Sequence, residues 1–100
     1  MNLRLRELLD IQNCLSIFKG KPEILEQTIS GFSIDSRLIN SNEIFIAIKG
    51  DKFDGHRFIP DVIAKGVRIC VVSRSWYEIH AKTKVIGNFL LVEDTMLALQ

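Results

Sequence analysis

The sequence predicts an α/β fold, with a small sheet of about four to five strands, largely parallel or mixed, flanked by helices. Apolar runs bounded by turn residues, which are typical of buried strands, alternate along the chain with segments whose apolar residues recur at helical spacing. Helices between the later strands indicate parallel pairing in the second half of the chain. The length of 100 residues and the apolar content of 47% are those of one small domain, residues 1–100.

The first expected element is a helix over residues 3–18, where leucine and isoleucine recur broadly at helical spacing. This helix can be broken near Asn13. Gly20 and Pro22 then end it, because glycine loosens the backbone and proline cannot continue a helical hydrogen-bond ladder.

The remaining elements alternate between strand and helix patterns. In residues 28–36, Phe32 and Ile34 point to one side and Ser33 and Asp35 to the other, which predicts a half-buried strand. The later elements are expected as a turn at 39–42, a strand at 43–50 buried on both faces, a helix at 56–65 with Pro60 in its first turn and Gly66 at its end, a buried strand at 67–73, a short helix at 75–84, a strand at 88–93 and a helix from residue 95, capped by Asp94 or Thr95.

Composition excludes several classes of function. Thirteen basic and twelve acidic residues leave a net charge of +1, which gives no reason to expect a nucleic-acid partner. No apolar run approaches the roughly 20 residues of a membrane span. Cys14 and Cys70 stand far apart in the sequence, so we expect two buried or half-buried reduced thiols and neither a disulfide nor a zinc site.

Three polar segments follow apolar strands: SIDSR at 33–37, KGDKFDGHR at 49–57 and VEDT at 92–95. Ligands of open α/β sheets gather beyond the carboxyl ends of strands, so these segments are the candidate site. Gly50 and Gly55 have the spacing of a P-loop, but His56 and Arg57 stand where that loop needs Lys and Ser or Thr. We therefore expect no ATP hydrolysis here; the loop is either a turn with a helix cap or an anion-binding loop.

The trio Asp35, Ser36 and Arg37 leaves a similar choice open. It is either a turn, in which Asp35 and Ser36 bond the backbone and Arg37 pairs with a carboxylate, or the polar rim of a small-ligand site. A third hypothesis gives Asp35 a nucleophilic or metal-binding role, although no second carboxylate is apparent beside it.

Taken together, these motifs resemble the N-terminal domain of the Mur ligases, the cytoplasmic ATP-dependent enzymes that form amide bonds in peptidoglycan synthesis. The resemblance covers about residues 29–100 and depends on the combined order of the motifs, each of which is weak alone. They are D-S-R at 35–37, F-x-A-I-x-G at 45–50, D-G-H-x-F-I at 54–59, Gly66 and D-T-x-x-A-L at 94–99. One departure is Ser41-Asn42 before Glu43, where the family usually carries Pro-Gly.

The resemblance implies that the domain anchors the UDP end of UDP-N-acetylmuramoyl-peptide. Ile34 and Ser36 would lie against the uridine with Arg37 nearby, and the loop Asp51-Lys52-Phe53 would flank the uridine or diphosphate. His56 is a weaker candidate for the same site. No catalytic or metal-binding residue is expected within this chain.

The resemblance also implies what surrounds the domain in the full enzyme. ATP and Mg²⁺ would be held by central and C-terminal domains that lie outside this sequence. KGDKFDGH and VEDTMLALQ are most similar to the ligase that adds D-alanyl-D-alanine. The ligase that adds the third stem-peptide residue, and a stand-alone binding module, remain alternatives.

Overall fold

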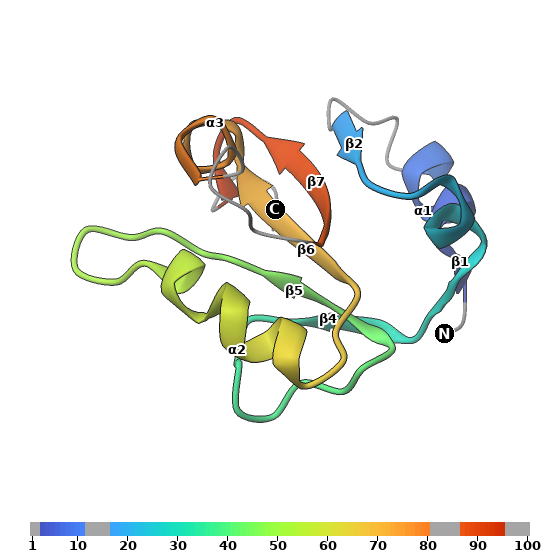
Figure 1. Ribbon diagram of the computed structural model, residues 1–100, viewed down its shortest axis with the longest axis horizontal. Helices are drawn as coiled ribbons and strands as arrows, with labels where there is room; N and C mark the ends of the chain where they lie inside the picture. Colours follow the sequence, from blue (N-terminus) through green and yellow to red (C-terminus); the bar gives the residue numbers. More distant parts are fainter. Residues whose placement is uncertain (1–2, 12–16, 81–86, 96–100) are drawn as a thin grey trace.

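The protein is a mixed five-stranded sheet covered by helices on both faces, as the sequence predicts (Figure 1). The computed structural model describes residues 3–11, 17–80 and 87–95. In order, its elements are β1 (Leu3–Arg4), α1 (Leu5–Ile11), β2 (Ile17–Lys19), the 3₁₀ helix η1 (Pro22–Glu26), β3 (Thr28–Ile29), β4 (Gly31–Ser33), β5 (Glu43–Ile46), the 3₁₀ helix η2 (Gly55–Phe58), α2 (Ile59–Ala64), β6 (Ile69–Ser73), α3 (Arg74–His80) and β7 (Asn88–Val92).

The main sheet has the order β2-β7-β6-β5-β4. Strands β4 to β7 run parallel to their neighbours, and β2 adds an antiparallel edge beside β7. A separate two-stranded sheet joins β1 to β3. From β5 to β7, parallel pairing follows from the helical connections, which return the chain to the same end of the sheet, whereas the segment between β4 and β5 contains turns and no helix.

Two apolar layers hold the sheet between its helices. On one face, Ile44 and Ile46 of β5 pack with Leu5 and Leu8 of α1. On the other face, Phe45 of β5 packs against the side chains of α2 and α3, which both lie on that side in Figure 1. Because β5 and β6 are central and buried on both faces, their sequences are continuous apolar runs.

The predicted helix over 3–18 is wrong at its far end. The helix α1 ends at Ile11, and Ile17–Lys19 form the strand β2. β2 pairs with β7, where Phe18 stands opposite Leu90. The β-branched and aromatic residues Ile17 and Phe18 suit a strand, and the edge of β7 offers them backbone partners that the local pattern does not reveal.

The predicted strand over 28–36 is two short strands in different sheets. β3 pairs with β1, whereas β4 forms the edge of the main sheet beside β5. Phe32 and Ile34 are 41% and 55% exposed, so neither is buried as the alternation suggested. The reason is position: β4 is an edge strand, and Ile34 lies beyond its end.

The later elements are confirmed in type and order where the structure describes them, but the strand predicted at 43–50 ends at Ile46, and the helix predicted at 56–65 begins as the 3₁₀ helix η2 before α2. Pro60 lies in the first turn of α2, and Gly66 follows that helix with φ of 98°, a conformation that favours glycine. Cys70 is buried, and burial raises the pKa of its thiol to about 12. The expected break near Asn13, Cys14, the end of the short helix after residue 80 and the helix after residue 95 lie outside the described residues.

No helix among the described residues is long and apolar enough to cross a membrane.

Candidate functional site

The three polar segments all follow carboxyl ends of strands on one edge of the main sheet, as the sequence predicts. SIDSR ends β4, KGDKFDGHR follows β5 and VEDT ends β7. The loop after β5 projects from this edge in Figure 1. The backbone N–H of Lys49 donates to Thr95 Oγ1 at 3.3 Å, so the second and third segments touch.

The turn after β4 is built by its own side chains. Asp35 Oδ1 accepts a hydrogen bond from the backbone N–H of Arg37 at 2.8 Å and lies 3.5 Å from Arg37 Nε. The bond from the Arg37 backbone is the largest cause that holds the pKa of Asp35 below its usual value. Asp35 therefore bonds the backbone of the turn and pairs with Arg37, as the turn interpretation predicts for these two residues.

Lys65 attaches this turn to the rest of the domain. Its Nζ donates to the carbonyl oxygens of Ser36 and Arg37, both at 2.8 Å. Since Lys65 caps the end of α2, the turn is held against that helix. The positions of Ser36 and Arg37 thus depend on a residue far along the chain.

A cleft of about 440 Å³ lies between this turn and the loop after β5. Its lining consists of Ile34, Asp35, Ser36, Arg37, Phe53 and Phe58. Four predicted site residues are thereby brought together: Ile34, Ser36, Arg37 and Phe53. Phe53 and Phe58, whose ring centroids are 6.1 Å apart, form an apolar wall, and Phe53 is 52% exposed.

The other predicted loop residues do not line this cleft. Asp51 and Lys52 are exposed at the loop tip, which is closed by a 2.7 Å hydrogen bond from Gly50 N–H to the Phe53 carbonyl. Phe58, the last residue of η2, was not predicted as a site residue, and it lines the cleft while it packs in part against the core. The sequence feature that could have indicated Phe58 as a cleft residue is its position five residues after Phe53, on the far side of the loop.

His56 lies apart from the cleft, in the core. Its side chain is buried, its Nδ1 lies 2.6 Å from Asp54 Oδ1, and its Nε2 accepts a hydrogen bond from the backbone N–H of Ser73 at 3.0 Å. Trp76 stacks on the ring with centroids 5.3 Å apart. Both ring nitrogens are thus used inside the protein, so the structure does not bring His56 together with the other predicted site residues.

Acid should destabilise the fold through His56. Burial is the largest cause that lowers the pKa of His56, and the Asp54 carboxylate opposes it only in part. An unfolded chain binds a proton at this histidine near pH 6.5, whereas the folded chain resists it. We therefore expect the free energy of unfolding, measured by urea denaturation, to fall as the pH drops below about 6.5 and to level off below the folded pKa of His56.

The variant His56→Gln should lose this slope, and His80→Gln should keep it. Protonation of the Asp54 carboxyl does not account for this slope. Burial raises its pKa, but the hydrogen bonds from His56 outweigh burial and leave the pKa lowered, so its protonation destabilises the fold only at lower pH. A constant free energy of unfolding between about pH 7.5 and 5.5 would contradict the assignment.

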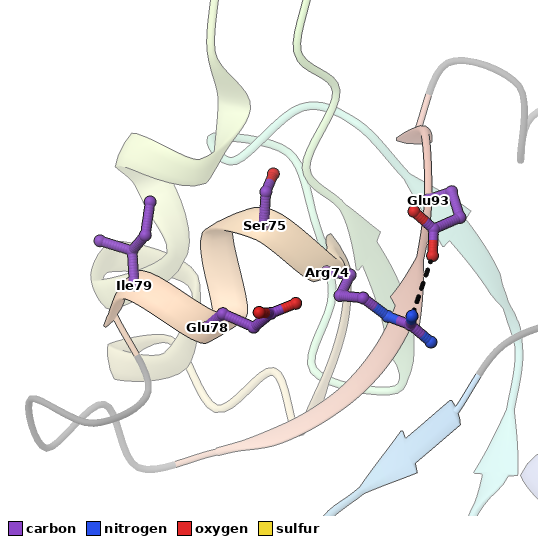
Figure 2. Close-up of a pocket in the computed structure, with 5 residues that line it drawn as sticks. All are labelled: Arg74, Ser75, Glu78, Ile79 and Glu93. Carbon is purple, nitrogen blue, oxygen red and sulfur yellow. Dashed lines mark ion pairs between the residues drawn. The ribbon is translucent and has the colours of Figure 1, made fainter.

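A second cavity of about 480 Å³ lies farther along the same edge, after β6 and β7 (Figure 2). It is lined by Arg74, Ser75, Glu78, Ile79 and Glu93. An ion pair of 3.3 Å joins Arg74 Nη1 to Glu93 Oε1, as the dashed line in Figure 2 marks. It contains none of the predicted site residues.

Within the described ranges, no group of three or more His, Cys, Asp or Glu side chains is placed to hold a metal ion. The whole sequence contains no G-x-x-x-x-G-K-[ST] motif.

The sheet and its cleft define an open-sheet α/β domain with a hollow where such domains bind ligands. Comparisons with known proteins agree on the family. The profile described as Mur ligase family, catalytic domain, matches residues 28–94. The chain therefore belongs to the Mur ligase family, as its motifs predict.

Two kinds of ligase are found among the similar relatives. UDP-N-acetylmuramoyl-tripeptide–D-alanyl-D-alanine ligase of Bacillus subtilis is 32% identical over 93 residues, covering 90% of this chain and 20% of that protein. UDP-N-acetylmuramoyl-L-alanyl-D-glutamate–2,6-diaminopimelate ligase of Phocaeicola vulgatus is 51% identical over 45 residues, covering 45% of this chain and 9% of that protein.

A crystal structure of MurF from Acinetobacter baumannii has the same fold, with a TM-score of 0.73 and 26% identity. The match covers 99% of this chain and 20% of that one. The chain spans about a fifth of the length of the D-alanyl-D-alanine ligases that it matches.

Proposed function

We propose that this chain is a single domain that holds the UDP end of UDP-N-acetylmuramoyl-tripeptide in an ATP-dependent ligase that adds D-alanyl-D-alanine to peptidoglycan precursors. The observation that carries the proposal is the cleft between the turn after β4 and the loop after β5. Its walls combine two kinds of surface that a uridine diphosphate requires. The family match and the names of the relatives support a ligand of this class.

The apolar part of the cleft suits the base. Ile34 and Phe53 are 55% and 52% exposed, so each has apolar surface that a flat uracil ring can cover. The polar part suits the ribose and diphosphate. Ser36 offers a hydroxyl, and Arg37, whose side chain is 88% exposed, offers a guanidinium that can pair with phosphate in bidentate fashion.

The loop tip completes the anion site in this proposal. Lys52 is exposed and placed on the loop that carries Phe53, so its ammonium can approach the diphosphate. Asp51 lies beside it and would flank the uridine or diphosphate with its backbone. His56 belongs to the frame of this loop, because both of its ring nitrogens are already engaged.

The reaction itself would depend on domains outside this sequence. In the full enzyme ATP phosphorylates the peptide carboxylate, and the amine of D-alanyl-D-alanine displaces the phosphate; Mg²⁺ supports the phosphoryl transfer. The present chain contributes position, by fixing one end of the substrate relative to those domains. We place this reaction in the cytoplasm, as the family resemblance implies, and expect no amide-bond formation by the 100-residue chain alone.

The diaminopimelate-adding ligase is the second candidate. Its support is the match of 51% identity over 45 residues. Both substrates share the UDP end, so the cleft suits both. The D-alanyl-D-alanine assignment is supported by two relatives that each cover 90% of the chain.

An NMR titration of the chain tests the binding role. UDP-N-acetylmuramic acid should shift the amides of Ile34, Ser36 and residues 50–54 saturably, and ATP should not. Shifts at residues 50–57 with ATP would instead assign the loop to a nucleoside triphosphate. No shift with either ligand would contradict binding by the chain alone.

Arg37 should supply much of the affinity. The variant Arg37→Met removes the guanidinium and keeps an unbranched apolar stem, so we expect the dissociation constant for UDP-N-acetylmuramic acid to rise roughly tenfold or more, as for one charge-assisted pair. Isothermal titration calorimetry measures this change.

Arg68→Met is the matched control, because it changes the net charge equally. Arg68 precedes β6, at the opposite edge of the sheet, where it bonds Gln27. Equal losses in the two variants would mean that general charge, rather than the cleft, attracts the ligand.

A further inference from the structure

His56 is a buried polar side chain that the proposed ligand site does not use directly. His56 is 3% exposed, and its ring connects two parts of the sheet edge. Asp54, at the base of the loop, is 2.6 Å from Nδ1, and Ser73, the last residue of β6, donates its backbone N–H to Nε2 at 3.0 Å. The ring is therefore a link between the loop and the neighbouring strand.

These contacts fix the protonation state of the ring. A backbone N–H can only donate, so Nε2 must be the acceptor and Nδ1 must carry the proton that is donated to Asp54. A second proton would have to sit on Nε2, where it would face the N–H of Ser73. The observed geometry thus accommodates the neutral imidazole and excludes the imidazolium.

The link reaches the cleft through the loop. Asp54 directly follows Phe53, which lines the cleft, and pairs with Lys49 to close the base of the loop. On the other side, Ser73 Oγ accepts the backbone N–H of Trp76 at 3.2 Å, and Trp76 stacks on the imidazole. Displacement of the ring would therefore release the loop from β6 and α3 together.

We propose that neutral His56 is a positioning residue for ligand binding, which ties the base of the loop 49–54 to the end of β6 and so sets the position of Phe53 in the cleft. The inference rests on the proposed function of that cleft. Its consequence is that protonation of His56 weakens ligand binding while the domain is still folded.

Burial, rather than the surrounding charges, favours the neutral state of the ring. Burial, followed by the charges of Lys49 and of His80 beyond Trp76, lowers the pKa of His56, while the Asp54 carboxylate raises it. The link thus stays intact near neutral pH and opens in acid.

An NMR pH titration of the wild-type chain tests the link without any ligand. Nitrogen shifts of the imidazole should show the Nδ1–H tautomer near neutral pH. The amides of Ser73 and of Asp51 to Phe53 should then move with the same midpoint as the His56 ring, within the pH range in which circular dichroism shows a folded chain. If the ring titrated while the amide chemical shifts of Asp51 to Phe53 stayed constant, the proposal would be overturned.

Calorimetry with UDP-N-acetylmuramic acid tests the consequence for binding. This ligand is suitable because its diphosphate is esterified at both ends and does not titrate near neutral pH. Between about pH 7.5 and a pH below the His56 midpoint, wild-type affinity should fall roughly tenfold, as for one lost buried hydrogen bond.

Two variants complete this experiment. His56→Gln, whose amide cannot be protonated in this range, should bind with little dependence on pH, and His80→Gln should keep the wild-type dependence. The same pH dependence in His56→Gln as in wild type would overturn the positioning role. If the wild type bound no ligand at either pH, the proposed function of the chain would fail, and the ligand-free titration would still decide the role of His56.

Discussion

Replacement of Gly55 by alanine is expected to destabilise the domain by about 3 kcal/mol, at the upper end of overpacking effects. A Cβ atom at Gly55 would lie 2.9 Å from the Ile48 nitrogen, 3.1 Å from the Ile48 oxygen and 3.3 Å from the Ala47 carbonyl carbon. All three atoms belong to the backbone that continues β5, so none can rotate away. The free energy of unfolding from urea denaturation measures the effect.

The same substitution should also damage the candidate site. Gly55 N–H donates to the Ile48 carbonyl at 2.6 Å, next to the Lys49–Asp54 pair that closes the loop. A side chain at Gly55 would force these two backbone segments apart, and Phe53 would move with the loop. We therefore expect weaker binding of UDP-N-acetylmuramic acid in any fraction that folds.

Gly50→Ala is the matched control for this prediction. It lies in the same loop, but the nearest atom to its Cβ would be the Phe53 oxygen at 3.9 Å, an ordinary contact. We expect little change in stability. Equal destabilisation of the two variants would show that the loop needs glycine for flexibility rather than for the close approach at Gly55.

The sequence predicts the elements whose signals are local. The strand β6 is a continuous apolar run, and α2 carries Pro60 in its first turn and Gly66 after its end. These features depend on residues adjacent in the chain, so no tertiary contact is needed to interpret them. The parallel order of β5 to β7 then follows from the connecting helices.

The elements that the sequence does not predict depend on distant partners. Ile17–Lys19 become a strand because they meet the edge of β7, a pairing between residues at opposite ends of the chain. Thr28–Ile29 leave the main sheet because β1 offers them an antiparallel partner. In both places the local sequence pattern is compatible with more than one structure, and the tertiary contact determines which one forms.

The candidate site likewise contains residues that the sequence predicts and a residue whose role it does not predict. Ile34, Ser36, Arg37 and Phe53 were predicted from a family pattern, and they meet in one cleft. The role of His56 could not be predicted, because its partner on β6 is the backbone N–H of Ser73, a group that no motif marks. Sequence patterns identify side chains with chemistry, whereas the frame that holds them consists largely of backbone contacts.

Phe45 and Phe32 provide the sharpest test of the sheet. Phe45 is fully buried on the central strand β5, in the layer that α2 and α3 cover. Its replacement by alanine should cost about 3–5 kcal/mol, because it removes a large apolar contact and leaves a cavity. Urea denaturation of Phe45→Ala at neutral pH measures this loss.

Phe32→Ala makes the same chemical change on the edge strand β4. Phe32 stands opposite Ile44, on the α1 side of the sheet, and shares a hollow with Leu8, but on this edge strand it remains 41% exposed. We expect a cost of about 1 kcal/mol or less, in proportion to the smaller area that it buries. A cost for Phe32→Ala equal to that for Phe45→Ala would mean that β4 is covered in solution, as the alternating pattern first suggested. A small cost would establish that the strand that leads into the Asp35–Arg37 turn is held by backbone pairing with β5 rather than by its aromatic side chain.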